Sequence, residues 1–159
     1  MSASPLPNTI WRNPIMLLAC GFGSGAAPKA PGTFGTLIAI PLFYVMADLS
    51  PLVYAAIVLG MFLIGIYLCD YTAKKLRVHD HPGIVWDEIV GYLITMFMFP
   101  NSWLWMLLGF GLFRLFDIWK PWPIRLLDRH VQGGFGIMID DVLAGIYALG
   151  CLYALKLII

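Results

Sequence analysis

Two pairs of adjacent acidic residues stand out because each pair lies inside a strongly apolar stretch of the chain. Asp87 and Glu88 occur within IVWDEIVG, and Asp140 and Asp141 occur within IMIDDVLAG. One carboxylate of each pair could cap the N-terminus of a helix. Capping does not account for the second, since a carboxylate among apolar residues at membrane depth is costly unless it is paired or bound to a metal. We therefore expect both pairs to be functional.

A fifth carboxylate, Asp117, is spaced by three residues from both Arg114 and Lys120. Neighbours at this spacing can meet on one helix face, and a simple salt-bridge ladder along a helix remains an alternative to a functional site. In the functional interpretation, hard oxygen ligands collected from three helices favour Mg²⁺ over zinc. The expected metal ligands are Asp87, Glu88, Asp140 and Asp141.

A glycine-rich stretch at residues 21–36 is the other conspicuous feature. It is not a Walker A loop, because Lys29 is not followed by Ser or Thr. It also matches the pattern GxGxxA of a dinucleotide fingerprint, but Pro28 and Pro31 would break the helix that such a turn must open. We expect an irregular loop that cradles an anion, with a plain turn between apolar helices as the alternative. The candidate anion-binding residues are Gly23, Ser24, Gly25, Lys29 and Thr33.

Two further polar segments could contribute to a site. His79 and His81 could bind a metal or transfer protons, although a solvated loop tolerates such residues equally well. The sequence WKPWP at residues 119–123 combines prolines, amphipathic aromatic rings and a cation next to an apolar run. Such a segment is suited to the membrane interface, where Lys120 and Arg125 could hold a lipid phosphate.

The composition indicates the kind of scaffold that must position these residues. The chain has 159 residues, of which 60% are hydrophobic and only 12% are charged, and its mean hydropathy is +0.83. These values exclude an ordinary soluble domain and a disordered chain. The formal net charge of +1 provides no basic surplus for binding nucleic acid. A membrane protein remains.

The apolar runs predict an all-α fold. Three runs, at residues 52–69, 103–119 and 142–159, are close to the roughly 20 residues that a spanning helix needs. Two shorter runs, at 34–46 and 84–99, could span only if the bilayer thins or their ends are buried. We expect a compact polytopic membrane helix bundle of four to five short spans, preceded by an interfacial or re-entrant helix near the N-terminus.

The basic residues predict a topology for this bundle. They cluster in the connections on one side, while the tight connections on the other side carry none; the clustered residues are Lys29, Lys74, Lys75, Arg77, Lys120, Arg125 and Arg129. The positive-inside rule places this side in the cytoplasm. We expect one membrane-embedded domain over residues 1–159, with residues 1–10 flexible and most ionisable groups at its cytoplasmic end.

Four separated motifs, in this order, resemble the phosphatidylglycerophosphatase A family of bacterial inner-membrane enzymes. They are GFGSG followed by PGT (residues 21–33), VWDE (85–88), FRLFDIWKPWP (113–123) and GIMIDD (136–141). The resemblance extends over almost the whole chain. It implies Mg²⁺-dependent hydrolysis of phosphatidylglycerophosphate to phosphatidylglycerol and phosphate, the last step of phosphatidylglycerol synthesis. Soluble relatives in the family are all-helical, so the resemblance also implies that the fold need not depend on every span crossing.

The chemistry of a phosphomonoester agrees with this resemblance. Its negative charges require positive charge near the phosphoryl oxygens, which Mg²⁺ on the two acidic pairs could supply together with Lys29, Arg114 and Lys120. The expected catalytic residues are Asp87, Glu88, Asp117, Asp140 and Asp141. Water activated by the metal is the preferred nucleophile, and an aspartyl-phosphate on Asp87, Asp140 or Asp141 is the alternative.

A small ion-coupled transporter that uses the intramembrane acids is the competing hypothesis. Coupling-ion sites in transporters usually lie near the bilayer midplane, whereas the acids here are expected at one interface beside cations. The spacing typical of lipid-synthesis transferases of the CDP-alcohol type does not occur in the sequence. The expected partners are therefore the lipid substrate and membrane lipids, with no nucleic acid and no inferable protein partner.

Overall fold

The computed structural model describes residues 5–158, and in that part of the chain all regular structure is helical. The expected all-α fold is confirmed. In chain order the elements are η1 (Asn8–Arg12), α1 (Pro14–Ala19), η2 (Gly21–Ala26), α2 (Pro31–Met46), α3 (Pro51–Leu76), α4 (Trp86–Thr95), α5 (Trp103–Trp119), α6 (Ile124–His130) and α7 (Gly133–Lys156).

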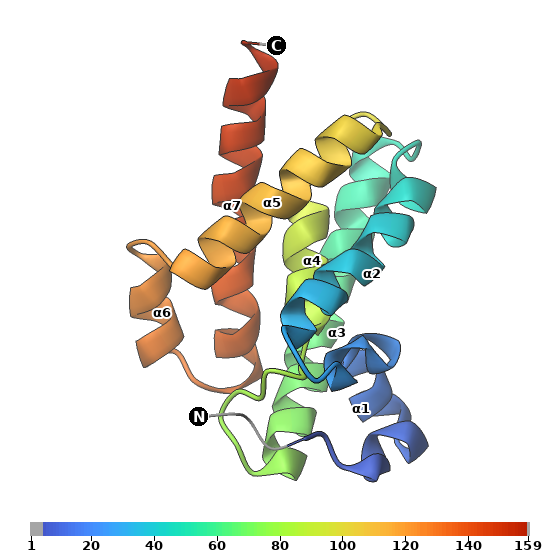
Figure 1. Ribbon diagram of the computed structural model, residues 1–159, viewed down its shortest axis with the longest axis vertical. Coiled ribbons are helices and arrows are strands. Elements are labelled where there is room, and N and C mark those ends of the chain that lie inside the picture. The colour runs from blue at the N-terminus through green and yellow to red at the C-terminus, as the bar shows by residue number, and fades with distance from the viewer. Residues whose placement is uncertain (1–4, 159) are drawn as a thin grey trace.

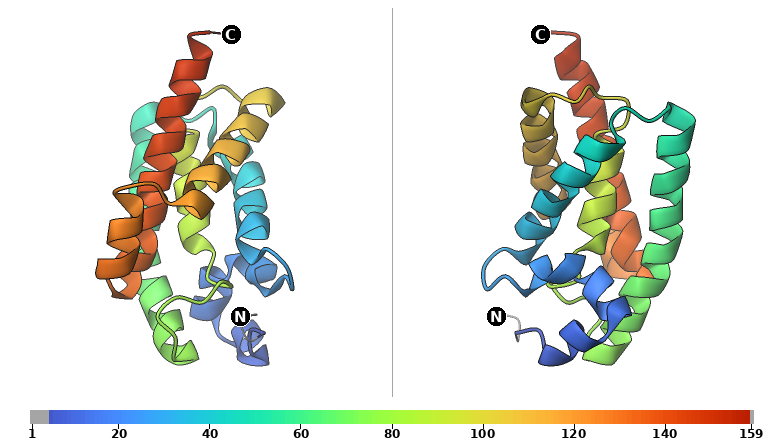
Figure 2. Two further views of the ribbon diagram at one scale, coloured as in Figure 1. Left: turned by 60° about the vertical axis from the view of Figure 1, so that its left-hand side comes forward. Right: turned by 90° about the vertical axis from the view of Figure 1, so that its right-hand side faces the viewer.

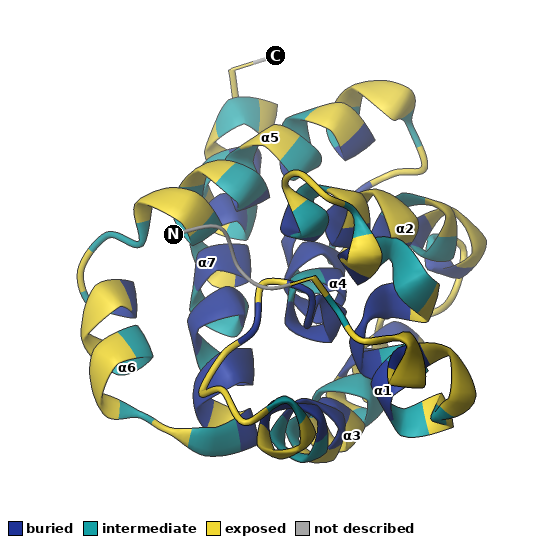
Figure 3. Cartoon of the chain, turned by 60° about the horizontal axis from the view of Figure 1, so that its bottom comes forward, coloured by how far each residue is buried: buried dark blue, intermediate teal, exposed yellow. Residues whose placement is uncertain are grey.

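The short helix α4 is the centre of the bundle, with α2, α3, α5 and α7 packed around it (Figure 1). Eight of its ten residues are buried, and Figure 3 shows this burial continuing into the neighbouring part of α7. Two glycines allow α4 and α7 to approach closely. A Cβ atom on Gly145 would lie 2.5 Å from the carbonyl oxygen of Gly91, and one on Gly91 would lie 2.8 Å from that of Asp141. This approach brings the two acidic pairs of the sequence together.

Two helices are long and apolar enough to cross a membrane, namely α3 with 26 residues and α7 with 24. Much of α3 turns apolar side chains outward, including Leu52 at 81% and Leu63 at 57% exposure. Large exposed apolar surface on such a helix fits contact with lipid. The helices expected at 34–46, 84–99 and 103–119 are present but shorter than α3 and α7. The structure thus fits a membrane protein, and α3 and α7 are its candidate spans.

The boundaries of the long helices differ from those expected. The α7 helix begins at Gly133, well before residue 142, because the glycine run packs against α3. A Cβ atom on Gly134 would lie only 1.9 Å from the carbonyl oxygen of Ile66, so the absence of side chains permits this contact. Close packing therefore outweighs the low helix propensity of glycine. The α3 helix is also longer than expected, because it continues beyond residue 69 to Leu76.

The N-terminal segment folds into short helices at the end of the bundle where α3 ends (Figure 2). The expected N-terminal helix is α1, whose backbone amides at Ile15 and Met16 donate to the side-chain Oδ1 of Asn13. Of the segment expected to be flexible, residues 1–4 lie outside the described residues. Within the remainder, Ile10 is buried at 1% exposure. The glycine-rich stretch begins with the short helix η2, in which Phe22 and Gly23 have positive φ angles.

Candidate active site

A cavity of about 300 Å³ lies where the start of α2, the start of α4, the end of α5 and the N-terminal half of α7 meet. We call it the acidic cavity, because six carboxylate side chains and two cationic side chains line it. These charged residues are Asp80, Asp87, Glu88, Arg114, Asp117, Lys120, Asp140 and Asp141. All five carboxylates that the sequence indicated are thus gathered in one place.

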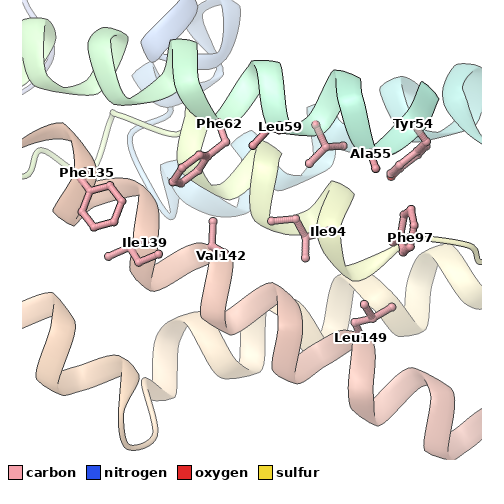
Figure 4. Close-up of a pocket in the computed structure, with 11 residues that line it drawn as sticks. Tyr54, Ala55, Leu59, Phe62, Ile94, Phe97, Phe135, Ile139, Val142 and Leu149 are labelled. Atoms are coloured by element: carbon pink, nitrogen blue, oxygen red, sulfur yellow. The ribbon is translucent and has the colours of Figure 1, made fainter. Parts of the chain in front are cut away.

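A larger cavity between α3, α4 and α7 has a different character. It measures about 510 Å³, and its lining consists of apolar and aromatic residues such as Phe62, Ile94 and Val142 (Figure 4). No charged side chain lines it. Because phosphate chemistry requires charged groups, the acidic cavity is the candidate active site.

Neither acidic pair caps its helix through a side chain. The N-cap of α4 is Val85, and the N-cap of α7 is Gln132, well before the second pair begins at Asp140. The capping alternative is therefore wrong for Asp140 and Asp141, which stand well inside α7. Asp87, Asp140 and Asp141 are exposed by only 8%, 5% and 2%. Asp87 and Glu88 nevertheless lie in the first turn of α4, where the helix dipole favours acidic residues, whereas Asp140 and Asp141 have no such position in α7.

Each acid of the two pairs has one buried carboxylate oxygen without a hydrogen-bond partner among the described residues. These oxygens are Oδ1 of Asp87, Oε2 of Glu88, Oδ1 of Asp140 and Oδ2 of Asp141. Buried polar atoms are almost always satisfied in folded proteins, and an unsatisfied carboxylate oxygen is especially costly. Four such oxygens around one cavity favour a bound cation, a bound proton or a ligand rich in donors.

Arg114 lies between two carboxylates from different helices. Its Nη1 lies 3.3 Å from Oε1 of Glu88 on α4, and the same nitrogen forms a close ion pair with Asp117 on α5. The salt bridge that the spacing allowed between Arg114 and Asp117 is therefore present, and both residues line the cavity.

Lys120 does not continue that ladder. It is the C-cap of α5 with a left-handed φ of 46°, which takes it off the helix face shared by Arg114 and Asp117. Its ammonium group instead donates to Asp140 on α7 and, at 2.7 Å, to Asp128 on α6. The alternative of a simple salt-bridge ladder along one helix therefore does not hold for Lys120, which links α5, α6 and α7 at the edge of the cavity.

Burial and like charges raise the pKa of two carboxyl groups of the cavity, Asp87 and Glu88. Burial raises the pKa of Asp87 well above its ordinary value, and the neighbouring Glu88 raises it further. The pKa of Glu88 is raised by burial and by Asp117. Lys120 behaves differently, because burial lowers its pKa but the nearby carboxylates, Asp140 first, outweigh that effect and raise it. Lys120 therefore stays charged at neutral pH.

The donor set of the cavity is suited to Mg²⁺, although no preformed cage holds one. Within residues 5–158, no three His, Cys, Asp or Glu side chains are already spaced to coordinate a metal ion. Mg²⁺ is commonly held by one or two carboxylates, with waters and substrate phosphate completing its shell. The unpartnered oxygens of the two acidic pairs provide ligands of that kind. The residues present thus fit the ion by chemistry.

The start of α2 closes the cavity from another side. Ala30, Pro31 and Gly32 line it, and a Cβ atom on Gly32 would lie 1.9 Å from Oε1 of Glu88. A side chain at this position would force the ends of Glu88 and Arg114 to shift from the ion pair that they form. The positive end of a 16-residue helix consequently borders the cavity, where it favours an anion.

Several predicted site residues lie elsewhere. Of the candidate phosphate ligands, Arg114 and Lys120 line the acidic cavity, whereas Gly23, Ser24, Gly25, Lys29, Thr33 and Arg125 do not. Gly23 packs against the ring of Trp11, and Gly25 packs against the backbone of Gly83. Lys29 is exposed. The glycine-rich stretch therefore reaches the cavity only through the residues that begin α2.

The histidines of the loop before α4 also lie outside the cavity. His79 is exposed, and His81 is buried with its Nδ1 accepting from the backbone amide of Gly83 at 3.0 Å. Asp80, between them, does line the cavity and was not predicted as a site residue. The sequence feature that could have indicated Asp80 as a site residue is its acidic side chain in the segment that leads to Asp87.

The fold and the cavity together define a class: an all-helical protein with two candidate membrane spans and a charged cavity lined by buried carboxylates. Comparison with known sequences identifies the family. The model of the phosphatidylglycerophosphatase A family matches residues 17–156, and the chain belongs to that family. The expected resemblance is confirmed, and the protein is a phosphatase.

Curated relatives agree with this family. The chain is 54% identical over 142 residues to phosphatidylglycerophosphatase A of Escherichia coli, a match that covers 89% of this chain and 83% of the relative. It is 48% identical to the Haemophilus influenzae enzyme of the same name, over 96% and 95% of the two chains. A provisionally named phosphatidylinositol-3-phosphatase of Bacteroides thetaiotaomicron is 38% identical, over 84% and 87%. No solved structure is significantly similar to the chain.

Proposed function

We propose that this protein is a Mg²⁺-dependent lipid phosphatase that hydrolyses phosphatidylglycerophosphate to phosphatidylglycerol and phosphate, the last step of phosphatidylglycerol synthesis. The observation that supports it most strongly is the gathering of four unpartnered carboxylate oxygens beside Arg114 and Lys120 in one cavity. The substrate follows from the names of the two phosphatidylglycerophosphatase A relatives described above. A transporter is not favoured, because these acids belong to a family of phosphatases.

In this proposal Asp87, Glu88, Asp140 and Asp141 hold Mg²⁺ through the oxygens that lack partners. When bound, the ion supplies positive charge that polarises the phosphoryl group and offsets the repulsion between the carboxylates and an anionic substrate. Asp80 lines the same cavity and adds to the negative potential that attracts the ion.

The cationic side chains bind and orient the phosphomonoester. The guanidinium of Arg114 and the ammonium of Lys120 approach the cavity from α5, and the positive end of α2 borders it from another direction. Donors fixed around the phosphoryl oxygens stabilise the charge that develops there during transfer. Asp117 positions Arg114 by pairing with it.

Hydrolysis requires a nucleophile and two proton movements. A water molecule attacks phosphorus while a carboxylate of the acidic pairs accepts its proton, and the bond between phosphorus and the glycerol oxygen breaks. The leaving oxygen then takes up the proton that this carboxyl group accepted from the water. An aspartyl-phosphate on Asp87, Asp140 or Asp141 is the alternative path. His79 and His81 do not line the cavity, so a role for them would require movement.

We place the protein in the bacterial inner membrane, with the acidic cavity on the cytoplasmic side. The last turn of α3 contains Lys74 and Lys75. This end of α3 lies toward the same end of the bundle as the start of α7 (Figure 2). Basic residues next to a spanning helix favour the cytoplasm. A substrate made at that face would reach the cavity without crossing the bilayer.

Phosphate release by the purified protein tests this proposal. Detergent-solubilised protein is incubated with phosphatidylglycerophosphate, with Mg²⁺ or with EDTA, and inorganic phosphate is measured. We expect release with Mg²⁺, loss of release with EDTA, and recovery when excess Mg²⁺ is restored. Undiminished release in EDTA would refute the metal requirement, and no release under any condition would refute the substrate.

A further inference from the structure

A second charged cavity adjoins the acidic cavity. It measures about 500 Å³ and is formed by α6 and the connection between α5 and α6. We call it the basic groove and define it by Trp119, Lys120, Trp122, Arg125, Arg129 and His130. Lys120 lines both cavities, so the two sites share one wall.

The basic groove offers cations that the protein itself does not neutralise. Arg125 and Arg129 lie at the surface of α6, and within residues 5–158 neither guanidinium forms an ion pair or a hydrogen bond. Their spacing of four residues along α6 places both on one helix face. Arg114 of the acidic cavity, in contrast, is held by two carboxylates. Guanidinium groups match the geometry of phosphate oxygens well.

Contacts with α5 and α7 fix the groove in place. Ile124 of α6 is fully buried, and the hydroxyl of Tyr147 on α7 donates to the backbone carbonyl of Trp122 at 3.2 Å. Asp128 of α6 bonds to Lys120 at 2.7 Å. Since these contacts tie α6 to α5 and α7, the two arginines stand at a set position relative to the acidic cavity.

The groove also has exposed tryptophans, which are typical of a membrane interface. The ring-bearing side chains of Trp119 and Trp122 are exposed by 60% and 79%. Tryptophan prefers the headgroup level of a bilayer, where its apolar body and polar N–H are both accommodated. A phosphate in this groove would therefore stand at the depth of lipid headgroups.

We propose that the basic groove binds the phosphodiester of the lipid substrate while the terminal phosphomonoester occupies the acidic cavity. This inference rests on the proposed function and extends it to selectivity. Phosphatidylglycerophosphate carries both kinds of phosphate, separated by one glycerol unit, and two adjoining cavities that share Lys120 match that arrangement. Arg125 and Arg129 then determine specificity by favouring lipids with a phosphodiester beside the scissile group.

The variant Arg125→Gln/Arg129→Gln tests this inference, with Arg77→Gln as a matched control for an arginine outside both cavities. Phosphatidylglycerol, which has only the phosphodiester, and inorganic phosphate, which resembles only the monoester, serve as competitive inhibitors in nonionic micelles. Loss of one charge-assisted hydrogen bond corresponds to about tenfold. We expect KM for phosphatidylglycerophosphate and Ki for phosphatidylglycerol to rise at least about tenfold, with kcat and Ki for inorganic phosphate little changed.

Other outcomes would contradict the inference, and each would indicate a different role for the two arginines or for the groove. Equal weakening of both inhibitors would mean that the arginines act on the whole site, and unchanged KM and Ki values would mean that the groove does not bind substrate. If only binding to vesicles of phosphatidylglycerol weakens, while KM for a short-chain monomeric substrate is unchanged, the groove binds bulk lipid. Failure of the wild-type protein to hydrolyse the substrate would refute the proposed function itself.

Discussion

The ammonium group of Lys120 donates to the carboxylate of Asp140, which joins the end of α5 to the acid-bearing segment of α7. The two residues are twenty positions apart in the sequence and belong to different predicted features. Their contact places a permanent cation at the edge of a cavity in which each acid of the two pairs keeps an unpartnered oxygen. A site arranged in this way can attract a cation and a phosphate together.

Replacement of Lys120 tests this relationship. We expect Lys120→Met to lower kcat/KM for phosphatidylglycerophosphate by about a hundredfold, because a donor to the phosphoryl oxygens is lost. Lys120→Arg should retain more activity, since it keeps the charge. Steady-state phosphate release measures both, and Lys75→Met provides a control for loss of a lysine outside the cavity. Equal activity of Lys120→Met and wild type would show that Lys120 is not part of the site.

The approach of α4 to α7 should depend on Gly145. A Cβ atom there would lie 2.5 Å from the backbone oxygen of Gly91, and such overpacking costs about 1–3 kcal/mol. Gly145→Ala should therefore lower the thermal unfolding midpoint in detergent and lower activity by separating the acidic pairs. Gly150→Ala is the matched control on the same helix, because a Cβ atom at Gly150 would meet no neighbouring atom within 4 Å. A Gly145→Ala protein as stable as the control would contradict the packing described.

Stability should depend on pH and Mg²⁺ together. Burial raises the pKa of Asp87 and of Glu88, and like charges raise both further. Between the ordinary and the raised pKa, the folded chain holds protons that the unfolded chain has released, so the free energy of unfolding falls as pH rises in EDTA. Mg²⁺ requires deprotonated ligands, so its stabilising effect should grow over the same window.

Thermal unfolding in detergent checks this dependence. We expect Mg²⁺ to raise Tm more at about pH 8 than at about pH 5, where the carboxyl groups retain protons. Ca²⁺ at the same concentration separates a specific effect from screening by a divalent ion. The same increase in Tm at both pH values would argue against Mg²⁺ on these acids.

Asp80 provides a test that the sequence did not suggest. Because its carboxylate lines the acidic cavity, Asp80→Asn should weaken the negative potential and raise the Mg²⁺ concentration needed for half-maximal activity, by up to about tenfold. Asp48→Asn removes an exposed acid from the connection between α2 and α3 and serves as the control. Identical Mg²⁺ titrations for the two variants would place Asp80 outside the functional site.

The proposed topology can be tested by chemical labelling. Cys20 and Cys69 are buried, so Lys75→Cys in a Cys151→Ser background offers one accessible thiol at the end of α3. We expect an impermeant maleimide to label it in inverted membrane vesicles and not in intact spheroplasts. The reverse pattern would place this end of α3 outside the cytoplasm.

The sequence predicted the helical fold and the meeting of the two acidic pairs, because carboxylates in apolar helices are costly unless they share a site. It could not predict that α7 starts at Gly133, since that depends on a close contact with the backbone of Ile66. The position of Asp80 beside the acids depends on the path of the loop before α4. Lys120 pairs with Asp140 only because its backbone leaves the helix at a positive φ.

The most direct test of the central claim is phosphate release from phosphatidylglycerophosphate by Asp141→Asn and Glu88→Gln, each compared with Asp48→Asn. Circular dichroism and size-exclusion chromatography confirm that the variants are folded. The account predicts that both site variants lose Mg²⁺-dependent release by more than about a hundredfold, because several kcal/mol of transition-state stabilisation disappear, while Asp48→Asn retains it. Wild-type turnover by both site variants would contradict the acidic cavity as the catalytic site.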